Sequence, residues 1–136
     1  MPDLLARTAL AAVAAVAVNV AARALATALF DIPDAFEHLA LRAVIVSTLA
    51  GVVAGGLVFA VISRFARDPV RTFRIVAVVA VVLSLAAPLS VGLQDPPEYP
   101  GTDAAAVGTL MLMHVLTAAI VVLALTGRSV TASRAR

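Results

Sequence analysis

The chain contains no cysteine and no lysine, and only 13% of its 136 residues are charged. The missing cysteine excludes disulfides, cysteine-ligated metals and thiol chemistry. Soluble domains average about 25% charged residues, so the charge content is too low for a water-exposed surface. Because Ala and Val dominate the chain, we attribute the missing lysine to genomic bias rather than to function.

Apolar residues make up 62% of the chain and are gathered into long runs. A membrane-spanning helix needs about 20 mostly apolar residues. Four such segments fit, at about 8–30, 42–63, 70–93 and 104–126, and leave only short loops. The sequence therefore predicts an all-α polytopic membrane protein, a four-transmembrane-helix bundle that forms a single transmembrane domain over residues 1–136.

The N-terminal run has a second interpretation. Arg7, an apolar stretch and Ala24-Leu25-Ala26 together resemble a signal peptide with its cleavage site. However, Arg23 stands directly before that site, and the run is long enough to span a bilayer. Retention as the first membrane helix is the favoured interpretation.

The ten basic residues are all arginines, and they are separated from the acids along the chain. Six acids and Arg42 flank one side of the spans, and Asp3 and Asp68 lie on the other side with eight arginines: Arg7, Arg64, Arg67, Arg71, Arg74, Arg128, Arg134 and Arg136. The positive-inside rule predicts that both termini and the 64–74 loop are cytoplasmic. The pI near 10.4 then reflects arginines beside anionic headgroups, and we expect no nucleic-acid partner.

Helix boundaries carry local signals. Asp68-Pro69 is a capping residue followed by proline, and Thr102 or Asp103 precedes the last span. Pro33 begins a segment that we expect to form a helix before the membrane and to continue into the second span.

The chain matches itself at an offset of 64 residues. The shift aligns Arg7-Thr8 with Arg71-Thr72, and Leu29-x-Asp31-x-Pro33-Asp34 with Leu93-x-Asp95-x-Pro97-Glu98. A duplication would give two helical hairpins in parallel orientation, related by an axis along the membrane normal. The alternative is that any two membrane hairpins share charged ends, and the sequence leaves both open.

Polar residues at membrane depth are costly and usually face other helices. We expect five residues to converge on the interior: Asn19, Arg23, Ser84, Pro88 and His114. Pro88 removes the hydrogen bond to the Ser84 carbonyl and should kink the third span, leaving a carbonyl that needs a partner. For Arg23, the alternatives are an extension to the headgroups, a pair with an outer acid, or a lipid or substrate contact. For His114, they are a structural hydrogen bond, a proton relay or a ligand contact.

Gly51-x-x-x-Gly55 permits close approach of another helix. Packing within the chain is favoured over a dimer contact.

Three short motifs carry a family resemblance: Arg71-Thr72-Phe73-Arg74, then Ser84-Leu85-x-x-Pro88-Leu89, then Met113-His114. The pattern resembles an uncharacterised domain-of-unknown-function family of small four-helix bacterial and archaeal integral membrane proteins. The resemblance covers most of the chain and is strongest from about 68 to 126. The resemblance implies four spans in the plasma membrane of a prokaryote and no assigned chemistry. It also implies that Arg71, Ser84, Pro88 and His114 belong together.

The sequence offers no nucleophile–base pair, metal cluster, phosphate loop or soluble domain. We therefore predict no catalytic, cofactor-binding or metal residues, and a non-enzymatic structural, assembly or lipid-interacting module. Its partners would be the lipid bilayer and either copies of itself or a larger membrane complex in which it is an accessory subunit. The alternative is an oligomeric small transporter or channel component with a polar interior around His114. A third hypothesis is an enzyme acting on lipid or a quinone, with Arg23 and His114 in a groove open to lipid.

Overall fold

A computed structural model describes residues 2–30, 32, 36–94 and 102–127, and within these ranges all regular structure is helical. The elements in chain order are α1 (Pro2–Leu29), the 3-10 turn η1 (Glu37–Leu39), α2 (Leu41–Phe65), α3 (Pro69–Ser84), α4 (Ala86–Gly92) and α5 (Ala104–Thr126). Four stretches are long and apolar enough to cross a membrane: Asp3–Leu29, Leu41–Phe65, Pro69–Gly92 and Ala104–Thr126. The prediction of an all-α protein with four spans is confirmed.

The helix starts follow from capping. Asp68 accepts a hydrogen bond from the Arg71 backbone N–H at 3.1 Å, and Pro69 occupies the first helical position, as predicted. At α5, the cap is Asp103, which accepts from the Ala106 N–H. α1 begins at Pro2, before the expected first span, because the helix continues beyond the apolar run that set the prediction.

We predicted a helix that begins before the membrane and continues into the second span, and this prediction is wrong within the described residues. η1 is a separate turn, and Ala40, with φ −55° and ψ 138°, interrupts the backbone before α2 begins. Phe36 and Leu39 are both almost fully buried, at 2% and 3% exposed. Both side chains are buried in one cluster with Val44 of α2 and with Ala106 and Met113 of α5, so the chain turns against these helices before α2 begins.

The third span is broken where the sequence places Pro88. α3 ends at Ser84, Leu85 is a turn, and α4 begins at Ala86. Because proline lacks the N–H that would bond the carbonyl four residues earlier, a regular helix cannot continue through this point. The kink predicted for the third span is observed as an interruption of the helix between Ser84 and Ala86.

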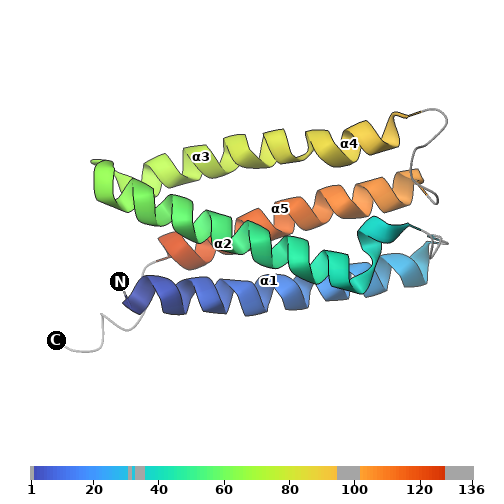
Figure 1. The fold of residues 1–136 in the computed structure, drawn as a ribbon, viewed down its shortest axis with the longest axis horizontal. Helices are drawn as coiled ribbons and strands as arrows, with labels where there is room; N and C mark the ends of the chain where they lie inside the picture. Colours follow the sequence, from blue (N-terminus) through green and yellow to red (C-terminus); the bar gives the residue numbers. More distant parts are fainter. Residues whose placement is uncertain (1, 31, 33–35, 95–101, 128–136) are drawn as a thin grey trace.

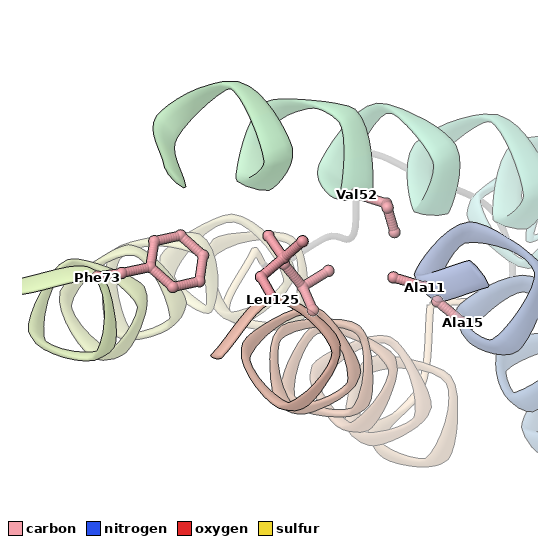
Figure 2. Packing of buried hydrophobic residues seen from close by; sticks show 6 residues of the cluster. Ala11, Ala15, Val52, Phe73 and Leu125 are labelled. Carbon is pink, nitrogen blue, oxygen red and sulfur yellow. The ribbon is translucent and has the colours of Figure 1, made fainter. Parts of the chain in front are cut away.

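The four spans share a core. α1 lies against α2 and α5, and α3 lies against the same two helices. Figure 2 shows one apolar cluster with side chains from every span: Ala11, Ala15, Val52, Phe73 and Leu125. The two alanines on α1 let its backbone approach its neighbours closely. The third span is the least buried of the four.

One end of the molecule holds the start of α1, the 66–68 turn and the end of α5 (Figure 1). Arg7 of α1 donates from Nη1 to the Gly127 carbonyl at 2.9 Å, so α1 begins beside the end of α5. From the 66–68 turn, α2 and α3 diverge toward the opposite end, α2 approaching α1 while α3 and α4 do not (Figure 1).

Candidate functional site

A partly open cavity of about 430 Å³ lies where α2 and α3 diverge, and we call it the α2–α3 groove. One wall is a stripe on α2: Ser47, Gly51, Ala54 and Val58. The other wall is a stripe on α3: Phe73, Val76, Ala77, Ala80 and Ser84. The floor is α5, from Leu110 to Val122. The spacing of three and four residues within each stripe places its members on one face of the helix.

The groove follows from side-chain size and from one aromatic contact. Phe73 packs edge-on against Phe59, with ring centroids 4.9 Å apart and planes at 70°, and holds α3 to α2 near their shared turn. Beyond it the walls consist largely of Gly, Ala, Ser and Val, which leave space between the diverging helices. His38 lines the opposite end.

Asn19 joins three helices beneath the groove. Its Nδ2 donates to the Thr48 hydroxyl on α2 at 2.9 Å and to the Thr117 hydroxyl on α5 at 2.8 Å. Asn19 is 2% exposed, and its Oδ1 has no hydrogen-bond partner among the described residues. Interhelical hydrogen bonds of this kind hold membrane helices together where no hydrophobic force acts between them.

His114 and Ser84 face the groove but do not bond each other. The His114 Nδ1 lies 2.7 Å from the Leu110 carbonyl of its own helix, and the Ser84 hydroxyl donates to the Val81 carbonyl at 2.8 Å. A carbonyl oxygen can only accept, so in its neutral form the His114 ring carries its hydrogen on Nδ1 and presents Nε2 as an acceptor. This nitrogen has no partner in the part of the chain that the structure describes.

The structure thus brings Asn19, Ser84 and His114 to the same groove, but not Arg23 or Pro88. The Arg23 Nε donates to the Leu39 carbonyl at 2.6 Å, so this arginine holds η1 against α1. Pro88 is buried in α4, beyond the break. Of the residues grouped by the family resemblance, Arg71 is also elsewhere, since it lies thirteen residues before Ser84, or about 20 Å along the helix.

Gly51 and Gly55 line the groove and face α5. A methyl group on Gly55 would come within 2.8 Å of the Val121 Cγ1, whereas one on Gly51 would lie 3.7 Å from the Thr117 Cγ2. Close approach within the chain therefore depends on Gly55. A methyl group on Gly56, outside the motif, would lie 3.0 Å from the Thr8 side chain of α1.

The sequence prediction missed Ser47 and His38 as neighbours of this site. The available signal was the repeat of small residues at Ser47, Gly51, Ala54 and Gly55, which marks one face of α2. Among the described residues, no group of three or more His, Cys, Asp or Glu side chains could hold a metal ion.

A family model described as a family of unknown function (DUF6069) matches residues 2–131. No curated protein and no solved structure matches the chain.

Proposed function

The chain belongs to DUF6069, a family of unknown function, and we propose that it is a non-enzymatic membrane protein that binds the apolar chain of a lipid in the α2–α3 groove. The observation that carries the proposal is the groove itself, a cavity of about 430 Å³ between two membrane-spanning helices. At this depth the protein is surrounded by hydrocarbon, so the apolar chains of lipids are the molecules in contact with the groove.

The wall residues support lateral entry. Ala54 and Val58 on α2, and Val76 and Ala80 on α3, are exposed, and all four line the groove. A chain could therefore enter from the bilayer without passing through either membrane surface. The described lining residues include no carboxylate, and the hydroxyl groups of Ser47 and Ser84 donate to carbonyls of their own helices rather than to a histidine, so neither serine is activated as a nucleophile.

Topology completes the proposal. We propose a four-helix bundle in a prokaryotic plasma membrane, with cytoplasmic arginine-rich ends. We also propose that the first span is retained rather than cleaved. Asn19 supports this, because its hydrogen bonds to Thr48 and Thr117 would be lost with α1.

The second candidate is an oligomeric transporter or channel component. Two observations favour it: the break at Leu85 in the third span, and the His114 ring facing the groove at that depth. Broken helices mark binding sites in several transporter folds. This candidate requires water along the groove, whereas lipid binding requires hydrocarbon.

The test is lipid retention by two neighbouring variants. Ala80→Phe places a large ring in the groove, while Val79→Phe places one at a position that is 52% exposed and outside the groove lining. The proteins are purified in mild detergent and bound lipid is quantified by mass spectrometry. The wild type and Val79→Phe should retain lipid, and Ala80→Phe should retain several-fold less. Equal retention by all three proteins would contradict the proposal.

A further inference from the structure

We propose that the groove selects an uncharged lipid that carries a hydroxyl group at mid-membrane depth, and that His114 Nε2 accepts the hydrogen bond from it. The proposal rests on lipid binding in the groove and adds the chemical class of the ligand. It follows from which hydrogen-bonding capacity the polar side chains have left.

The His114 ring is the principal acceptor. Its Nδ1 hydrogen is already donated to the Leu110 carbonyl at 2.7 Å, which leaves the lone pair on Nε2 unused. A neutral ring also avoids the cost of placing a charge in hydrocarbon. A group that bonds Nε2 must therefore bring its own hydrogen.

Most donor hydrogens of the neighbouring polar side chains are already used in hydrogen bonds within the protein. Ser84 donates to the Val81 carbonyl at 2.8 Å, and Ser47 donates to the Val44 carbonyl at 3.2 Å, so both hydroxyl oxygens remain as acceptors. Asn19 uses both amide hydrogens on threonine hydroxyls. Thr117, which lines the groove, keeps a hydroxyl hydrogen. An alcohol can donate to Nε2 and accept from such a hydroxyl, so it suits both kinds of group.

The depth of these groups excludes a charged headgroup. His114 is the eleventh residue of the 23-residue helix α5, about 15 Å from its start and about 18 Å from its end. That is the middle of a hydrocarbon core about 30 Å thick, where ionised groups are costly. Phospholipid headgroups stay at the interface, whereas the single hydroxyl of a long-chain or isoprenoid alcohol can lie at this depth.

The experiment compares three ligands of matched chain length on the purified full-length protein in detergent. Radiolabelled hexadecan-1-ol is the probe, and hexadecan-1-ol, hexadecyl methyl ether and hexadecane are the competitors. The ether keeps the oxygen but has no hydrogen to donate. We expect the ether and the alkane to compete about tenfold more weakly than the alcohol, the effect of roughly one hydrogen bond.

Two variants locate the acceptor. His114→Leu should weaken binding of the alcohol to the level of the ether and leave the ether unchanged. Val115→Leu, at an exposed position of α5 outside the groove lining, should behave as the wild type. The comparison of ligands on the wild type does not depend on either variant folding.

Each outcome separates the two proposals. Equal affinity for all three ligands overturns the hydroxyl preference and leaves lipid binding intact. A preference for the alcohol that persists in His114→Leu overturns the assignment of His114. If none of the ligands binds, the groove does not hold apolar chains, and the proposed function itself fails.

Discussion

The Asn19 side chain of α1 donates a hydrogen bond of 2.8 Å to the Thr117 hydroxyl of α5. The Asn19 side chain is almost completely buried, at 2% exposed. The same amide nitrogen bonds Thr48 of α2, so one side chain joins the first, second and fourth spans. The third span takes no part in this contact, and α2 and α3 diverge to leave the groove.

This network predicts an order of stabilities. Thr117→Val leaves a buried amide N–H without its acceptor, and we expect it to lower the free energy of unfolding by about 1–3 kcal/mol. Asn19→Leu removes two bonds worth about 0.6 kcal/mol each in a membrane, but it also removes the Oδ1 that lacks a partner. It should therefore cost less than Thr117→Val. Thermal unfolding in detergent measures both.

The double variant is the control for that order. Once Asn19 is leucine, the N–H that Thr117 served no longer exists, so adding Thr117→Val should cost little more. Additive losses in the double variant would show that the two side chains act independently, contrary to the geometry.

Gly55 should tolerate no side chain. Gly55→Ala would bring a methyl group within 2.8 Å of the Val121 Cγ1, and overpacking of this kind costs about 1–3 kcal/mol. Gly51→Ala makes an ordinary contact at 3.7 Å, and a methyl group on Gly108 meets nothing within 4 Å. These two controls should be neutral or should stabilise the helix by up to about 1 kcal/mol. Equal destabilisation by all three would contradict a specific seam at Gly55.

Phe73 is predicted to anchor the third span. It is the buried residue of α3, at 2% exposed, whereas Phe65 is 78% exposed. Phe73→Ala should cost about 2–3 kcal/mol, below the roughly 3–5 of a water-soluble core, because lipid is as apolar as the core it replaces. Hydrogen exchange should rise in α3 and not in α1. Phe65→Ala is the matched control, and we expect little change from it.

The sequence predicts the helices more completely than it predicts the contacts between them. The lengths of the apolar runs predicted the four spans. Asp68-Pro69 predicted where α3 begins, and Pro88 predicted where the third span is broken. Each of these signals is local in the sequence. Arg23 is different, since its partner, the Leu39 carbonyl, exists only once η1 turns beneath the helices. Depth along a helix can be read from the chain, whereas the neighbour that a side chain meets depends on how the helices are arranged.

The 64-residue repeat stays a prediction, but its offset allows the first and third spans to be compared position by position. The same offset pairs Asn19 of α1 with Leu83 of α3, which is 68% exposed. The first span has a polar side chain that holds its neighbours, and the corresponding position in the third span has an outward-facing leucine. That difference fits the looser third span and the groove beside it.

Arg7 should stabilise the end of α5. Its Nη1 lies 2.9 Å from the Gly127 carbonyl and 3.5 Å from the Leu125 carbonyl, where the helix dipole favours a cation. Arg7→Gln should cost about 0.5–1 kcal/mol and speed hydrogen exchange in the last turn of α5. Arg71→Gln removes a charge from an exposed position at the same end, and it should leave that exchange unchanged.

The absence of cysteine makes the orientation directly testable, since any single cysteine introduced is the only one in the protein. Ala66→Cys lies in the turn between α2 and α3, and Thr102→Cys lies just before α5 at the other end, and neither changes a charge. The positive-inside rule places the first in the cytoplasm and the second outside. A membrane-impermeant maleimide should therefore label Thr102→Cys in intact spheroplasts and Ala66→Cys only after lysis. The reverse pattern would mean that the arginines do not set the orientation, and labelling of both in intact cells would mean a mixed topology.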